Sequence, residues 1–153
     1  MQDVQEVADR FIAGAIPSED FPRWAAQALA EGLDSPTLRE LGGLPRAEVR
    51  EGRDLMRRAL MELGAVLPPF HAGPEDLVIY WASRMTAGTV GPVDGTSWML
   101  SQADALGWPD WLNQLTGLAS EWDDWPEGRE QLESEMLAEA SALLAKRRPG
   151  QSG

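Results

Sequence analysis

Apolar residues recur every three or four positions along most of the chain, the spacing that gathers them on one face of an α-helix. Proline stands near the start of several such segments and glycine follows their ends, as is typical of helix boundaries. The pattern covers residues 3–13, 22–31, 35–41, 45–63, 74–87, 96–106, 109–122 and 126–147. It therefore predicts a chain of helices joined by short connections.

These segments predict an all-α fold, a multihelical orthogonal bundle of about seven to eight short-to-medium helices. Residues 65–73 contain Pro68 and Pro69 and cannot continue a helix, so this stretch is the expected joint if the bundle divides into two helical sub-bundles. At 153 residues the chain has the common size of one domain. We expect a single helical domain over residues 1–148 and a flexible tail at 149–153.

One segment also allows a strand. The run from Leu77 to Trp81 is rich in β-branched and aromatic residues, a composition typical of a buried strand. Pro74, Glu75 and Asp76 precede it, and a proline followed by acids is typical of the first turn of a helix, so we interpret the run as helical. Residues 88–95, which follow, contain several glycines and are predicted to form a loop.

Residues 32–41 read Gly-Leu-Asp-Ser-Pro-Thr-Leu-Arg-Glu-Leu. Ser35 is placed to cap a short helix, and Pro36 would stand in its first turn. The pattern Gly-x-Asp-Ser-Pro-x-Leu-Arg-x-Leu resembles a stretch of small, uncharacterised helical proteins of bacteria. The resemblance implies an all-helical fold and no particular activity.

The net charge of the chain indicates which kinds of molecule it can bind. The chain has 25 acidic and 13 basic residues, and its formal net charge is −12. Between Asp94 and Glu139 there are 11 acids and a single base, Arg129. Such a surface repels nucleic acid and anionic membranes and attracts basic proteins. On the helix at 45–63 the charges alternate in sign every four residues, which predicts a ladder of exposed ion pairs at Arg50, Asp54, Arg58 and Glu62.

Tryptophan is concentrated in the same acidic part of the chain. Five of the seven tryptophans are Trp98, Trp108, Trp111, Trp122 and Trp125. Indole rings that lie beside carboxylates can form a core with an acidic surface, or a cage for an alkylammonium or arginine group. We expect Trp111 and Trp122 on the buried face of one helix, and Trp108 and Trp125 at helix ends.

Residues for catalysis or metal binding are scarce. Cysteine is absent, and the one histidine, His71, stands in a proline-rich loop without acids at metal-ligand spacing. The glycines of residues 88–96 resemble a phosphate cradle but lack its lysine. The acid pairs Glu75-Asp76 and Asp123-Asp124 each precede or open a predicted helix, so we expect them to cap helix starts. We therefore predict no catalytic residue, no metal site and no cofactor.

The preferred hypothesis is a non-catalytic, acidic, cytoplasmic protein–protein interaction module, similar to an inhibitor or immunity protein, that binds a basic protein. The predicted binding residues are Trp108, Asp110, Glu121, Asp123, Asp124 and Trp125. The alternative is a helical small-molecule-binding protein with a tryptophan-lined pocket for a cationic ligand. We expect neither nucleic acid nor a membrane as partner, because of the acidic charge and because no apolar run approaches the roughly 20 residues of a membrane span. The oligomeric state is left open.

Overall fold

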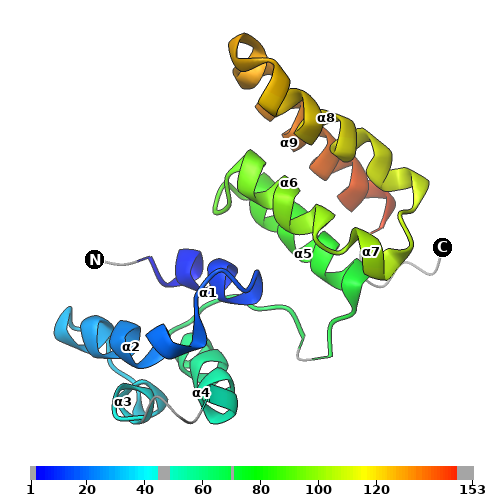
Figure 1. The fold of residues 1–153 in the computed structure, drawn as a ribbon. Coiled ribbons are helices and arrows are strands. Elements are labelled where there is room, and N and C mark those ends of the chain that lie inside the picture. The colour runs from blue at the N-terminus through cyan, green and yellow to red at the C-terminus, as the bar shows by residue number, and fades with distance from the viewer. Residues whose placement is uncertain (1–2, 45–48, 70, 148–153) are drawn as a thin grey trace. The chain divides into compact units, whose positions relative to one another are not determined.

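The computed structural model describes residues 3–44, 49–69 and 71–147 (Figure 1). Within these ranges the chain is all-α, with nine α-helices, three short 3₁₀ turns and no strand. The predicted fold class is therefore confirmed. The chain divides into two compact units, an N-terminal unit at Met1–Leu67 and a C-terminal unit at Pro68–Gly153. The division falls at the prolines that interrupt the helical pattern.

The N-terminal unit has four α-helices and one 3₁₀ turn, in the order α1 (Val4–Ile12), η1 (Ser18–Asp20), α2 (Phe21–Ala30), α3 (Pro36–Gly42) and α4 (Val49–Glu62). Its core gathers around Phe21, Leu38, Leu41, Met56 and Leu60, which are fully buried. The predicted cap at Ser35 is confirmed, because its hydroxyl accepts a hydrogen bond from the amide of Leu38. The structure adds a cap at Asp3, whose side chain accepts hydrogen bonds from amides in the first turn of α1.

Glu62 makes a different contact from the one its charge pattern predicts. Its carboxylate accepts hydrogen bonds from the Thr37 hydroxyl at 2.6 Å and from the Thr37 amide at 3.1 Å. No ion pair joins Arg58 to Glu62 in the described part of the chain, and the side chain of Arg50 lies outside it. The predicted ladder is therefore wrong at its C-terminal end, because Glu62 binds the first turn of α3 instead.

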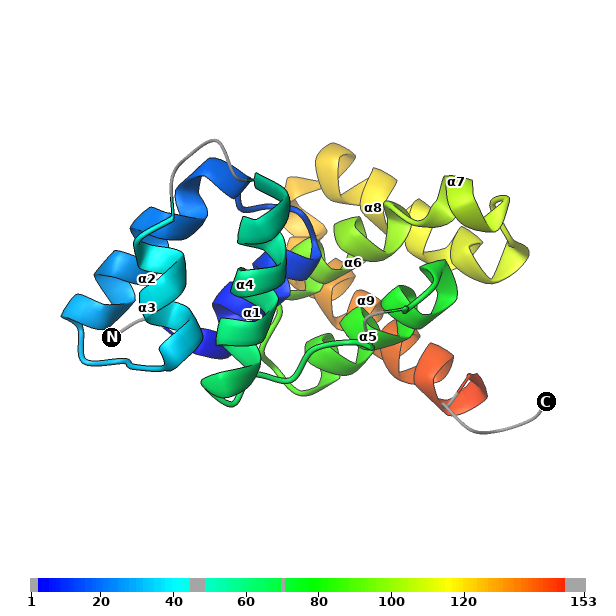
Figure 2. The ribbon, with the colours of Figure 1, turned by 90° about the horizontal axis from the view of Figure 1, so that it is seen from below.

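The C-terminal unit has five α-helices and two 3₁₀ turns. They are α5 (Pro74–Thr86), α6 (Pro92–Leu100), α7 (Ala103–Leu106), η2 (Asp110–Leu112), α8 (Asn113–Asp124), η3 (Pro126–Gly128) and α9 (Arg129–Lys146). Helix α5 packs against α6 and α9, and α8 packs against the same two helices (Figures 1 and 2). The largest fully buried side chain is Trp81, whose ring centroid lies 6.2 Å from that of Trp98.

The run from Leu77 to Trp81 lies in α5, which confirms the helical interpretation. Two neighbouring predictions are wrong. Residues 92–95 do not belong to a loop, because α6 begins at Pro92, and the predicted helix at 96–106 is divided into α6 and α7. The break follows α6 directly, where the Ser101 hydroxyl donates a hydrogen bond to the carbonyl oxygen of Trp98. Such local side-chain bonds compete with the helical pattern.

Candidate functional site

The six predicted binding residues lie at the two ends of α8. Trp108 and Asp110 precede its first residue, whereas Glu121, Asp123 and Asp124 lie in its last turn and Trp125 follows it. A helix of 12 residues is about 18 Å long, so the two groups do not form one compact cluster.

Trp108 is held exposed by its own backbone and by a hydrogen bond. Its side chain is 54% exposed, and it is the one non-glycine residue of the described chain with a positive φ, 51°. Its indole N–H donates to the Asp104 carboxylate at 2.6 Å. A residue of this size in the left-handed region costs on the order of 1–3 kcal/mol. The fold therefore fixes a large apolar ring in solvent at an energetic cost.

Trp125 is 41% exposed and lies over the turn that follows it. A Cβ atom added to Gly128 would stand 2.1 Å from the Trp125 ring, so the ring packs directly on the backbone of η3. Both indoles expected at helix ends are thus accessible to a partner.

The acids at this end of α8 correct a prediction. Asp123 and Asp124 stand in the last turn of α8, not at a helix start, so they do not cap amide groups. The unpaired carbonyl groups at the C-terminus of a helix carry partial negative charge. They repel a carboxylate in the last turn, so acids at this position destabilise the helix. Glu75-Asp76 does behave as expected, because Asp76 accepts a hydrogen bond from the Gly73 amide at 3.2 Å.

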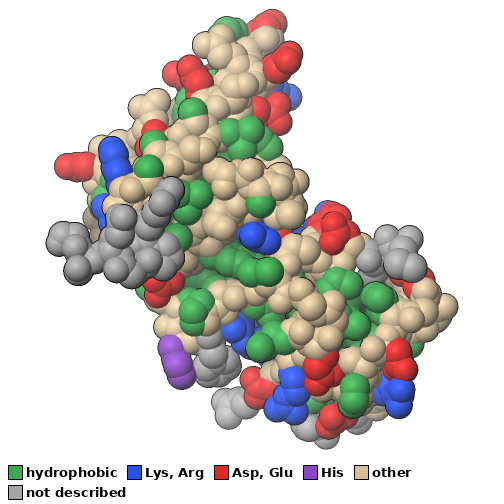
Figure 3. All heavy atoms as spheres, turned by 180° about the vertical axis from the view of Figure 1, so that it is seen from behind, with side chains coloured by type: hydrophobic (Ala, Val, Ile, Leu, Met, Phe, Trp, Pro, Cys, Tyr) green, Lys and Arg blue, Asp and Glu red, His purple; other side chains and the backbone are tan. Residues whose placement is uncertain are grey.

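No ion pair neutralises Glu121, Asp123 or Asp124 within the described ranges. Arg129, the single basic residue between Asp94 and Glu139, does not pair with these acids. It donates its Nε–H to the Trp122 carbonyl oxygen at 3.1 Å, and its guanidinium lies 4.8 Å from the centroid of the Trp122 ring. Figure 3 shows acidic side chains gathered around the turn where α8 ends and α9 begins, at the top of the view.

A continuous exposed stripe joins the two ends of α8. Its members are exposed and fall at helical spacing on one side; they are Asp110, Gln114, Gly117, Glu121 and Asp124. We call this stripe, with Trp108 and Trp125 at its ends, the α8 outer face. Asp123 is one residue away from Asp124 and lies on the side of α8 that faces α6 instead.

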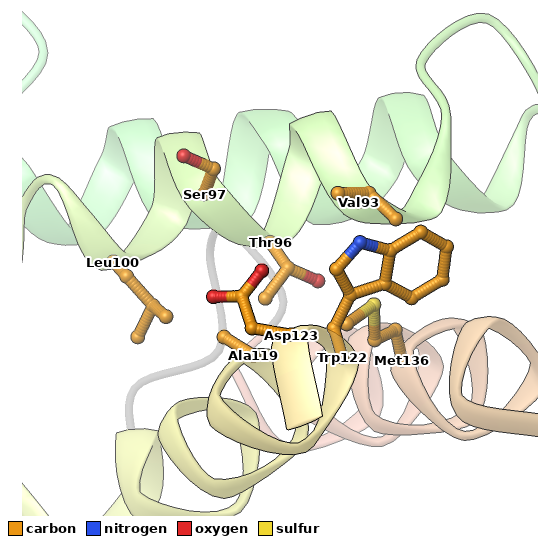
Figure 4. A pocket seen from close by; sticks show the side chains of 8 residues that line it. All are labelled: Val93, Thr96, Ser97, Leu100, Ala119, Trp122, Asp123 and Met136. Carbon is orange, nitrogen blue, oxygen red and sulfur yellow. The ribbon is translucent and has the colours of Figure 1, made fainter. Parts of the chain in front are cut away.

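On that side, α6, α8 and α9 line a pocket of about 250 Å³ that is open to solvent (Figure 4). It is lined by Val93, Thr96, Ser97, Leu100, Ala119, Trp122, Asp123 and Met136. Of this set, only Trp122 and Asp123 belong to the tryptophans and acids that the sequence marks as possible ligand contacts. The other six could not be found from the sequence, because the glycines of residues 88–95 predict a loop where α6 begins and no local pattern pairs α6 with α9.

Trp111, by contrast, is covered by a cation of the chain itself. The Arg147 guanidinium lies 4.0 Å from the centroid of the Trp111 ring and pairs with the Glu75 carboxylate. A tryptophan ring and a carboxylate thus bind a cation at this position, but the cation is Arg147 of the chain itself. The two contacts join the end of α9 to α5.

The described residues contain no group of three His, Asp or Glu side chains arranged to hold a metal ion. None of the helices within the described ranges has both the length and the apolar composition that a membrane crossing needs.

Fold and site together define an all-α protein whose C-terminal unit carries an acidic, tryptophan-bearing face beside a small pocket. No protein-family model, curated protein or solved structure matches the chain.

Proposed function

We propose that the protein is a non-catalytic interaction module of the bacterial cytoplasm, similar to an inhibitor or immunity protein, that captures a basic protein through the α8 outer face. One observation carries the proposal. Two exposed indoles, Trp108 and Trp125, stand beside carboxylates that no cation of the described chain neutralises.

The arrangement suits a basic partner for two physical reasons. Exposed tryptophan side chains often contribute much of the binding energy of protein interfaces, and the face of the ring attracts lysine and arginine. The uncompensated carboxylates between the two rings attract the same groups and raise the rate of encounter.

The size of the face also fits. Residues 110 to 124 span about 21 Å at 1.5 Å per residue. A standard interface buries about 800 Å² on each partner, so one partner can cover both tryptophans at once. The exposed residue midway is Gly117, which has no side chain to hold a partner away.

The test compares matched variants in a pull-down from the host, followed by binding kinetics with the recovered protein. The face variant is Asp110→Asn, Glu121→Gln and Asp124→Asn. The control variant is Glu19→Gln, Glu40→Gln and Asp54→Asn, which changes the net charge equally on exposed positions of the N-terminal unit. We expect the partner to bind the wild type and the control, and to bind the face variant with slower association.

Raising the salt from 0.1 to 1 M should slow association with the wild type, because the screening length falls from about 10 to about 3 Å. Trp108→Ala and Trp125→Ala should mainly speed dissociation. The proposal is wrong if the control variant loses as much binding as the face variant, or if association does not depend on salt.

A further inference from the structure

The pocket between α6, α8 and α9 has an apolar interior and few polar atoms. Its apolar walls are Val93, Leu100, Ala119, Trp122 and Met136. A volume of about 250 Å³ holds roughly eight water-sized groups at ~30 Å³ each. This is below the usual range of about 300–1,000 Å³ for drug-sized ligands, so the pocket suits a small molecule or a single side chain.

Thr96 supplies the polar atom of the interior. The residue is 1% exposed, and its hydroxyl oxygen has no hydrogen-bond partner. A buried hydroxyl left in this state costs about 1–3 kcal/mol. The side chain comes from α6, and Figure 4 shows its oxygen on the side of Trp122 and Met136. A ligand in the pocket would supply the missing partner.

Asp123 supplies the charge. Its carboxylate reaches from α8 toward α6, close to Thr96 in Figure 4, and forms no ion pair or hydrogen bond within the described ranges. Asp123 is the only charged residue among those that line the pocket. The site therefore favours a cation and repels an anion.

Trp122 gives the pocket an aromatic wall with a fixed orientation. Arg129 stacks on the ring and bonds to the backbone carbonyl of the same residue, so the indole is held from outside the pocket lining. Met136 adds a flexible thioether that adapts to the shape of an apolar chain.

We infer that this pocket binds a primary alkylammonium group, with the alkyl chain along Trp122 and Met136 and the ammonium between Asp123 and Thr96. The ammonium donates hydrogen bonds to the Asp123 carboxylate and to the Thr96 hydroxyl oxygen, and its third N–H faces water. This inference does not rest on the proposed partner, because the pocket uses Asp123 and not the three carboxylates of the α8 outer face.

A primary alkylammonium group can belong to a free amine or to the side chain of a lysine residue. The experiment titrates the full-length protein with n-butylammonium chloride, and in a separate arm with Nα-acetyl-lysine amide, while NMR follows the assigned signals of Thr96 and Trp122. Sodium butyrate and 1-butanol carry an alkyl chain like that of butylammonium but no ammonium group, so they are the controls for the free amine. Nα-acetyl-norleucine amide is the corresponding control for the lysine amide. Affinity for so small a group is expected in about the millimolar range.

We expect at least one ammonium compound to shift both signals and its uncharged or anionic control to leave them unchanged. Tighter binding of butylammonium identifies a free amine, and tighter binding of the lysine amide identifies a side chain. Butyltrimethylammonium, which cannot donate hydrogen bonds, should bind several-fold more weakly. Equal binding of butanol or butyrate, or no shift with either primary amine at tens of millimolar, overturns the inference.

Variants separate binding from stability. Asp123→Asn should weaken amine binding about tenfold or more, whereas Asp124→Asn, its neighbour on the α8 outer face, should leave it unchanged. Thr96→Val should weaken amine binding and also raise the melting temperature of the ligand-free protein, because it removes a hydroxyl that has no partner. Equal losses in Asp123→Asn and Asp124→Asn would mean that general acidity binds the amine, and the inference would fail while the proposed partner surface still stood.

Discussion

Glu121, Asp123 and Asp124 stand in the last turn of α8, where the helix carbonyls concentrate negative charge. No basic residue occupies that turn. Basic residues in the last turn of α8 would stabilise the helix, so folding does not explain the acids found there. Sequences depart from such local rules mainly at functional surfaces. Glu121 and Asp124, the acids of this turn that support the proposed function, are therefore expected to lower the stability of the protein.

This balance can be measured one residue at a time. Glu121→Gln and Asp124→Asn should each raise the free energy of unfolding by about 0.3–1 kcal/mol at low ionic strength. Asp110→Asn, near the N-terminal end of α8, should lower it by a similar amount. Urea denaturation at low salt measures all three, and 1 M salt should remove most of the differences. A loss of stability in both Glu121→Gln and Asp124→Asn would contradict this account.

Glu62 illustrates the opposite case, a carboxylate whose interaction stabilises the fold. Hydrogen bonds from Thr37 lower the pKa of the Glu62 carboxyl below its ordinary value. A group whose pKa is lower in the folded state stabilises the protein above its unfolded pKa, about 4.3 for glutamate. That contribution is lost as the pH falls through the lowered folded pKa.

Glu62→Gln should therefore destabilise the protein at pH 7, and the difference from the wild type should shrink as the pH falls below about 4. Denaturant unfolding at a series of pH values measures both effects. Glu40→Gln, an exposed carboxylate of α3, serves as the control and should show a much smaller change. A difference between wild type and Glu62→Gln that persists unchanged at pH 3 would show that the charge of Glu62 plays no part.

At the scale of elements, α5 and α6 approach each other closely through Gly95. A Cβ atom at this position would stand 2.3 Å from Cγ of Met85 and 3.3 Å from Cγ1 of Val90. Met85 is buried and cannot move aside freely. A glycine that reads as part of a loop in the sequence is thus required by the packing of two helices, and α6 in turn forms one wall of the pocket.

Gly95→Ala should destabilise the protein by about 1–3 kcal/mol, the usual cost of overpacking a core. The matched control is Gly117→Ala on α8, where a Cβ atom meets nothing within 4 Å. This second change should stabilise the protein by up to about 1 kcal/mol, because alanine favours the helix over glycine. Thermal or denaturant unfolding measures both changes in stability. Equal changes for the two variants would contradict the close approach of α5 and α6 at Gly95.

At the scale of the whole molecule, each compact unit has its own core. The buried cluster around Phe21, Leu38 and Leu60 involves only residues of the N-terminal unit. The core of the C-terminal unit contains Trp81, Leu115 and Met136. A core contained in one unit does not require the other unit in order to form.

The fragments 1–67 and 68–153 should therefore each fold alone, with helical circular dichroism and a cooperative melt. The shorter fragment should melt at the lower temperature, since a domain of about 60 residues buries only about 60% of its unfolded surface. A non-cooperative melt of fragment 68–153 would show that its core depends on residues before Pro68.

The sequence by itself determined the helical class, the starts of α1, α2, α3 and α5, and the caps at Ser35 and Asp76. Periodicity and capping act within a few residues, so they can be read along the chain. Only the tertiary structure decided which helix faces meet. Thr96 and Met136 reach one pocket, and Arg147 lies over Trp111 while it pairs with Glu75, 72 residues away. Such contacts depend on the packing of helices distant in sequence, and no local spacing encodes them.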